Sequence, residues 1–116
     1  MRRVAITGMG VVSSIGNDVG EVTNSLRNGT SGIVAAPEYA ELGFRSQIHG
    51  TVKLDVKDHI DRKKLRFMGE GAAYAVLAME QAIADAGLSE IQVSNVKTGL
   101  VAGSGGPSTA NLLEAF

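Results

Sequence analysis

The segment between Gly71 and Gly87 constrains the fold of this chain more than any other feature. Alanine recurs through the segment, interleaved with larger apolar residues, and Glu80 and Asp85 are its only charged residues. The pattern predicts one long helix over residues 62–86, with Gly87 at the position that commonly ends a helix in a left-handed conformation. A helix that is apolar on nearly every side must be buried on several sides. We therefore expect layers of structure around it.

Two short segments are the candidates for a sheet. Residues 3–7 are rich in β-branched side chains, residues 98–102 form a short apolar run, and glycine follows each of them. Both patterns are typical of strands, and the second is typical of a parallel strand buried on both faces. Residues 109–116 look like the opening of a further helix. The order of strands and helices predicts an α/β arrangement, of which this chain is the front part.

A shorter helix is predicted over about residues 18–28. Asn17 or Asp18 can cap its amino terminus, and Gly29 stands where its carboxyl end needs a glycine. Between residues 31 and 59 the pattern weakens, with only hints of short strands. We interpret this part as an excursion across a surface.

Composition excludes several classes of function. The chain has 116 residues, enough for one small domain, and a formal net charge of -1, which gives no whole-chain case for a nucleic-acid partner. Without cysteine it has no disulfide, no thiolate nucleophile and no cysteine-ligated metal. Neither a membrane span nor a signal peptide is recognisable, so we expect a cytoplasmic protein. His49 and His59 lack metal-ligand spacing, and we interpret them as structural or surface residues.

Two glycine-rich loops are candidate ligand sites. Residues 8–13 follow a strand, but Ser13 replaces the third glycine of the dinucleotide-binding pattern, and the next helix begins too late to meet a pyrophosphate. We interpret this loop as tight backbone packing. Residues 103–106 lie at the carboxyl end of the second strand, where ligands approach α/β sheets, so a ligand-lining role and a plain turn are both open. Ser104 lacks the frame of a hydrolase nucleophile.

Four cations within five residues form the most distinctive charged feature. Arg62 and Arg66 are one helical turn apart and Lys63 lies beside Arg66, so the three can share one face. Cations at a helix amino terminus oppose the macrodipole, which suggests an anionic partner. An ordinary solvated charge run is the alternative. Asp61 can cap the helix and offset part of the cost.

A resemblance to a known family runs over almost the whole chain and is carried by residues 3–16, 31–33, 60–63, 66–68, 81–88 and 103–106. They resemble the amino-terminal part of bacterial β-ketoacyl-acyl-carrier-protein synthases of type I, condensing enzymes of fatty acid synthesis. The opening stretch marks condensing enzymes broadly. The Asp-Arg-Lys and Arg-Phe-Met motifs, at residues 61–63 and 66–68, indicate type I.

The resemblance implies a thiolase-like fold with two similar α/β halves in five αβαβα layers, acting as a homodimer. Residues 1–116 would then be an incomplete amino-terminal domain, with no complete second domain. The implied activity is an acyltransferase reaction, the decarboxylative Claisen condensation of malonyl-carrier protein with an enzyme-bound acyl group. It needs a cysteine and two histidines and no metal or redox cofactor. His49 and His59 match neither histidine, so no catalytic residue is expected within 1–116, and this stretch alone should be inactive.

The resemblance also assigns binding roles. Three cations match positions that bind the acidic acyl carrier protein: Arg62, Lys63 and Arg66. Lys64 has no such assignment. Gly106 matches a glycine beside the acyl-chain pocket, and residues from Pro107 onward should approach the dimer interface. The alternatives are a standalone binding module for an acidic partner protein, which would use the same basic face, and a fragment of a dinucleotide-dependent oxidoreductase.

Overall fold

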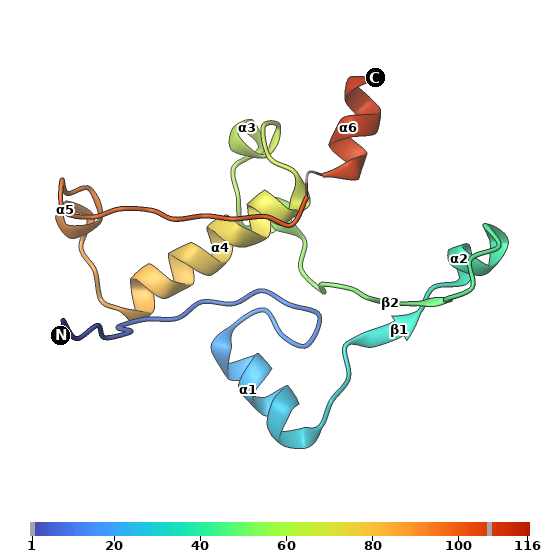
Figure 1. Ribbon diagram of the computed structural model, residues 1–116, viewed down its shortest axis with the longest axis horizontal. Helices are drawn as coiled ribbons and strands as arrows, with labels where there is room; N and C mark the ends of the chain where they lie inside the picture. Colours follow the sequence, from blue (N-terminus) through green and yellow to red (C-terminus); the bar gives the residue numbers. More distant parts are fainter. Residues whose placement is uncertain (1, 107) are drawn as a thin grey trace. The chain divides into compact units, whose positions relative to one another are not determined.

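Helix α4, Glu70–Asp85, is the longest helix of the computed structural model, which describes residues 2–106 and 108–116 (Figure 1). The chain divides into two units. The first contains the residues up to Gly10 together with those from Asp55 onward, and it includes α4. The second contains Val11–Leu54.

The single long helix predicted over residues 62–86 is wrong, because two helices occupy this range. Helix α3 spans Arg62–Leu65, and α4 begins only at Glu70. Gly69 separates them, with an extended backbone of φ -76° and ψ 163°. Glycine is a weak helix former because its backbone loses more conformational entropy in a helix than that of any other residue. The predicted carboxyl end is confirmed, since Gly87 has a left-handed φ of 64°.

Burial of α4 is confined to one stripe. Ala73 and Leu77, one turn apart on the helix, are its buried residues, and Ile60 completes the buried apolar group of this unit. The 3-10 helix η1, Val56–Asp58, contacts α4. Burial on several sides, expected from the apolar pattern, is therefore not reached within the described part of this chain.

The opening segment of the chain approaches the backbone of α4 closely through two glycines. A Cβ atom on Gly8 would overlap the carbonyl oxygen of Ala82, and one on Gly10 would overlap the carbonyl oxygen of Ala78. Only a residue without a side chain permits such an approach. The interpretation of this loop as tight backbone packing is confirmed.

Asp85 fastens the same segment to the end of α4. Its Oδ2 atom accepts a hydrogen bond of 2.9 Å from the backbone N–H of Met9. A carboxylate in the last turn of a helix is disfavoured by the helix dipole, so the hydrogen bond offsets an electrostatic cost. The hydrogen bond gives a structural reason for the presence of Asp85 in a segment that is otherwise almost entirely apolar.

Neither of the two predicted strands is a strand in this structure. Residues 3–7 and 98–102 have no ladder hydrogen bonds, and the sheet found among the described residues lies elsewhere. Val4 is 94% exposed and Val101 is 96% exposed. A strand requires a hydrogen-bonded neighbour, and the described residues provide none for either segment. Both segments therefore have a sequence typical of a strand, but among the described residues neither has a neighbouring strand to pair with.

Two short helices complete the first unit. Helix α5, Glu90–Val93, begins with a capping box in which Ser89 and Gln92 bond reciprocally. Helix α6, Thr109–Ala115, is capped by Ser108, and it confirms the helix predicted at the end of the chain.

The second unit opens with helix α1, Val19–Asn28, as predicted. Asp18 is the cap, and its Oδ1 atom accepts from the N–H of Glu21 at 2.8 Å. The Glu21 carboxylate accepts in return from the N–H of Asn17, also at 2.8 Å. Gly29 ends the helix with a left-handed φ of 65°. Both predicted ends are therefore confirmed.

An antiparallel hairpin follows α1. Strand β1, Ile33–Ala35, pairs with β2, Ile48–Gly50, so that Val34 lies opposite His49. Helix α2, Pro37–Glu41, lies in the connection between the two strands. The sequence pattern missed most of this motif because three-residue strands are too short to display an alternating period.

Replacing Gly10 with alanine should lower the free energy of unfolding by roughly 1–3 kcal/mol, because the new Cβ must displace the backbone of α4. Gly71→Ala is the matched control, since a Cβ there meets nothing within 4 Å. Alanine at this helical position should leave stability unchanged or raise it by up to about 1 kcal/mol. Urea unfolding followed by circular dichroism measures both. Equal midpoints for the two variants would contradict the packing argument.

Tyr74 on α4 should ionise at higher pH than an ordinary tyrosine. Burial raises the pKa of its phenol above the usual 10.0, and the carboxylates of Glu70 and Asp55 raise it further. The folded state then holds this proton more tightly than the unfolded state, so this contribution to stability is complete below pH 10 and is lost as pH rises through the folded pKa. A difference titration of wild type against Tyr74→Phe by absorbance at about 295 nm measures the shift. A titration step at or below the ordinary value would contradict it.

Candidate functional site

The basic site lies on helix α3, which is a single helical turn. Asp61 caps the turn, since its Oδ1 atom accepts from the backbone N–H of Lys63 at 2.7 Å. At the other end the N–H of Arg66 donates to the carbonyl of Arg62 at 3.3 Å. The predicted cap is confirmed. These backbone bonds hold four neighbouring cations in one compact group, which we call the α3 basic patch: Arg62, Lys63, Lys64 and Arg66.

The predicted opposition between the four cations and the dipole of the long helix is wrong. The four cations do not stand at the start of the long helix, because α4 begins four residues after Arg66 with Glu70 in its first turn. A one-turn helix has almost no macrodipole to oppose, so the dipole cost gives no evidence of an anionic partner. The case for such a partner must come from exposure and charge.

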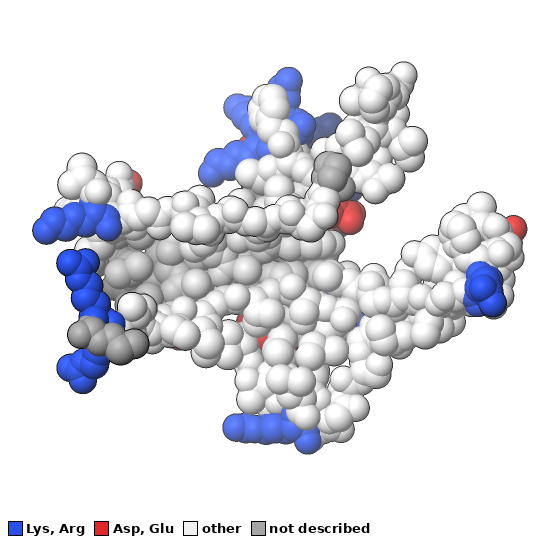
Figure 2. Space-filling view, viewed as in Figure 1, with Lys and Arg blue, Asp and Glu red and all other residues white. Residues whose placement is uncertain are grey.

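All four side chains of the α3 basic patch are exposed, and Figure 2 shows Lys and Arg side chains gathered over α3. In the described part of the chain, the one close contact between a carboxylate and a basic side-chain nitrogen joins Glu38 and His49 in the other unit. No described carboxylate lies within 4 Å of a charged nitrogen of the patch. These cations are therefore available to an anion from outside the chain.

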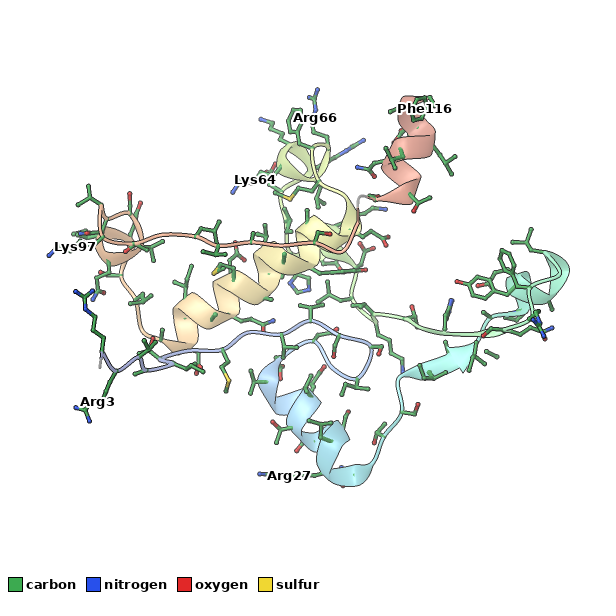
Figure 3. All side chains as sticks on the ribbon, viewed as in Figure 1. Arg3, Arg27, Lys64, Arg66, Lys97 and Phe116 are labelled. Carbon is green, nitrogen blue, oxygen red and sulfur yellow. The ribbon has the colours of Figure 1, made fainter. Side chains whose placement is uncertain are left out.

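The members of the patch do not all point the same way. Figure 3 shows Arg66 and Lys64 leaving α3 in different directions. On a helical turn Arg62, Lys63 and Arg66 fall within about 100° of one another, whereas Lys64 lies about 100° beyond Lys63. The three cations selected from the sequence therefore share a face that Lys64 does not.

Phe67 adjoins the patch, and sequence reasoning placed it in a family motif but assigned it no role in the site. The side chain is 78% exposed, and the guanidinium carbon of Arg66 lies 4.8 Å from the centroid of its ring. This is the geometry of a cation–π contact. The available signal was an aromatic residue directly after Arg66, in a chain with only five aromatic residues, namely 2 Tyr and 3 Phe.

The start of α6 lies against the turn between α3 and α4. A Cβ atom on Gly69 would lie 2.8 Å from the Cβ of Ser108, the cap of α6. Beyond this contact α6 exposes Leu113 and Phe116, and Figure 3 shows Phe116 at its far end. Pro107, where the predicted dimer-facing segment begins, lies outside the described residues.

The loop at residues 103–106 is an exposed local turn. The Ser104 hydroxyl donates to the carbonyl oxygen of Gly106 at 2.7 Å. A Cβ on Gly106 would meet nothing within 4 Å. Gly106 therefore has open space beside its Cα atom, and it is distant from the α3 basic patch in the sequence. Its predicted place beside an acyl pocket stays a prediction.

The two histidines take separate structural positions. His49 stacks edge-on against Tyr39, with its Nδ1 atom 3.4 Å from the tyrosine hydroxyl and 3.9 Å from a carboxylate oxygen of Glu38. His59 is the exposed residue that ends η1. Across residues 2–106 and 108–116, no three His, Asp or Glu side chains could hold a metal together. The ring and hydroxyl contacts of His49 and the exposure of His59 fit the interpretation of the two histidines as structural or surface residues.

The second unit has one notable hollow, of about 260 Å³, lined by residues that include Ser14, Ser25 and Lys53. Much of its polar lining is already used internally. The Ser25 hydroxyl donates to the carbonyl of Ile15 at 2.6 Å, and the Glu21 carboxylate accepts from Asn17. We assign it no chemistry.

None of the described helices combines the length and the apolar character that crossing a membrane requires.

Comparison with known proteins decides the family. A sequence profile described as "Beta-ketoacyl synthase, N-terminal domain" matches residues 1–115. The chain belongs to the β-ketoacyl synthase family. Within that family it corresponds to the amino-terminal domain.

The chain is 56% identical over 115 residues to 3-oxoacyl-[acyl-carrier-protein] synthase 1 of Haemophilus influenzae, covering 99% of this chain and 28% of that protein. It is also 56% identical over 109 residues to the Escherichia coli synthase 1, covering 93% and 27%. Identity to synthase 2 of Vibrio harveyi is 34% over 105 residues, covering 90% and 25%. The chain therefore spans little more than a quarter of the length of the curated relatives it matches.

Proposed function

We propose that this chain is the amino-terminal part of a β-ketoacyl-acyl-carrier-protein synthase of type I, an acyltransferase of fatty acid elongation. The observation that carries the proposal is the 56% identity to synthase 1 proteins over nearly the whole chain. The higher identity to synthases 1 than to the Vibrio synthase 2, at 34%, supports type I.

The reaction is a decarboxylative Claisen condensation. An acyl group held as a thioester on an enzyme cysteine is attacked by the carbanion that malonyl-carrier protein forms when it loses carbon dioxide. The products are a β-ketoacyl-carrier protein and the free cysteine. Because this chain contains no cysteine, the nucleophile must lie outside residues 1–116, and this stretch alone should not catalyse the reaction.

Two features of the described unit fit an incomplete thiolase-like domain. Residues 3–7 and 98–102 are strand-like but unpaired, and α4 buries only the stripe of Ala73 and Leu77. We propose that in the complete enzyme both segments pair within a sheet of the five-layer αβαβα fold, which covers α4. Homodimer formation, with residues from Pro107 onward near the interface, is part of the same proposal.

The role that we assign to this stretch is docking of the acyl carrier protein. The Arg62-Lys63-Arg66 face is exposed and free of described carboxylate partners, which suits an acidic protein surface. Gly106 lies, in this proposal, beside the acyl-chain pocket of the complete enzyme. The names of the relatives include the acyl carrier protein, which is the partner that we propose here.

Reversing the charge at Arg62 and Arg66 together, in the full-length protein, should weaken binding of acyl carrier protein roughly tenfold or more at low salt. Like charges then face each other where opposite charges attracted. Arg27→Glu, Lys97→Glu is the control with the same change in net charge, because both cations are exposed and lie outside the α3 basic patch. Isothermal titration calorimetry at two salt concentrations measures the affinities. An equal loss in both double variants would contradict a specific docking face.

Carbon dioxide release from malonyl-carrier protein, in the presence of an acyl-carrier protein, tests the condensing activity of the same full-length protein. We expect activity in the wild type. In the Arg62→Glu, Arg66→Glu variant we expect a raised KM for the carrier protein and a nearly unchanged kcat, since a docking contact stabilises the bound substrate and the transition state equally. A protein that binds the carrier protein but never condenses would instead be a binding module for an acidic partner.

A further inference from the structure

Arg66 differs from the other cations of the α3 basic patch in its surroundings. Its guanidinium lies over the ring of Phe67, with the guanidinium carbon 4.8 Å from the ring centroid. For Arg62, Lys63 and Lys64 the described residues provide no comparable aromatic contact. Arg66 therefore has an aromatic contact that the other cations of the α3 basic patch lack among the described residues.

Phe67 is not part of the core of its unit. The buried apolar residues there are Ile60, Ala73 and Leu77, whereas Phe67 is 78% exposed. A single exposed apolar side chain is ordinary on a protein surface. Phe67 is unusual because its ring contacts a cation of the docking face. The contact can order that cation, and it contributes little to the core.

Stacking changes what the guanidinium can do. A guanidinium over an aromatic ring keeps N–H donors at its edge, away from the ring. Those donors remain free to bind a carboxylate with two parallel hydrogen bonds. An arginine already ordered in this way loses less side-chain entropy on binding than a free one, so the complex gains affinity.

We propose that Phe67 is a positioning residue of the docking face, which holds the Arg66 guanidinium flat for two-point pairing with a carboxylate on the acidic surface of the acyl carrier protein. The occupant follows from charge: four exposed cations without described carboxylate partners suit a protein surface rich in Asp and Glu. The inference rests on the docking role proposed above and adds the residue that orients one of its cations.

The test uses the full-length protein and purified acyl carrier protein, with affinity measured by titration calorimetry at low salt. Phe67→Leu keeps an apolar side chain but removes the ring, and it should weaken binding about two- to fivefold. Phe67→Tyr and Phe67→Trp keep an aromatic face, and both should bind at least as tightly as the wild type. Thermal unfolding of each variant separates loss of docking from loss of fold.

A double-mutant cycle with Arg66→Ala distinguishes positioning from direct contact. If Phe67 acts through Arg66, Phe67→Leu should have no further effect once Arg66 is alanine. An equal loss in both backgrounds would overturn the positioning role. So would an unchanged affinity of Phe67→Leu in the wild-type background. Poor folding of Phe67→Leu would leave the aromatic variants decisive, because weaker binding by both Phe67→Tyr and Phe67→Trp also overturns the proposal.

The outcomes also separate this inference from the docking proposal. If Arg62→Glu, Arg66→Glu leaves the affinity for carrier protein unchanged, the docking face itself is wrong and the role of Phe67 falls with it. If that double variant weakens binding while Phe67→Leu does not, docking stands and only the positioning role is overturned.

Discussion

The close approach of residues 8–10 to helix α4 is the contact on which the first unit depends. Gly8 and Gly10 bring one backbone against another at the carbonyl groups of Ala82 and Ala78, and Asp85 fastens the intervening N–H of Met9. Small residues are needed on both sides of such a contact, since any added volume must displace a helix backbone. The small side chains of α4 and the glycines of the opening segment are therefore both needed for this close contact.

The break at Gly69 has a different consequence, because it separates an apolar helix from a basic turn. If residues 62–86 formed one helix, the direction of each cationic side chain would be fixed by the helical turn of α4. The cations would also lie near the positive amino-terminal end of the α4 dipole. As a separate turn capped by Asp61, α3 presents its charges independently of the packing of α4. The residues that we propose for docking therefore lie on a different helix from Ala73 and Leu77, which are buried.

Much of the local structure could be predicted from the sequence. The cap at Asp18, the left-handed glycines at positions 29 and 87 and the cap at Asp61 all follow from short-range stereochemistry. The glycine pattern predicts the tight packing of Gly8 and Gly10, but their partners on α4 are set by the tertiary structure. Residues 3–7 and 98–102 could not be predicted in the same way. Their strand-like patterns state a preference, but a strand also needs a partner, and partners are set by the tertiary fold.

The candidate site shows the same division. The sequence by itself determined which cations stand together, that their turn is capped, and which family they resemble, because each depends on residue type and spacing. Only the tertiary structure decided that the basic turn is a helix of its own, that its cations lack described carboxylate partners, and that the Arg66 guanidinium lies over the ring of an exposed Phe67. These depend on where side chains meet in space, which residue spacing along a chain does not specify.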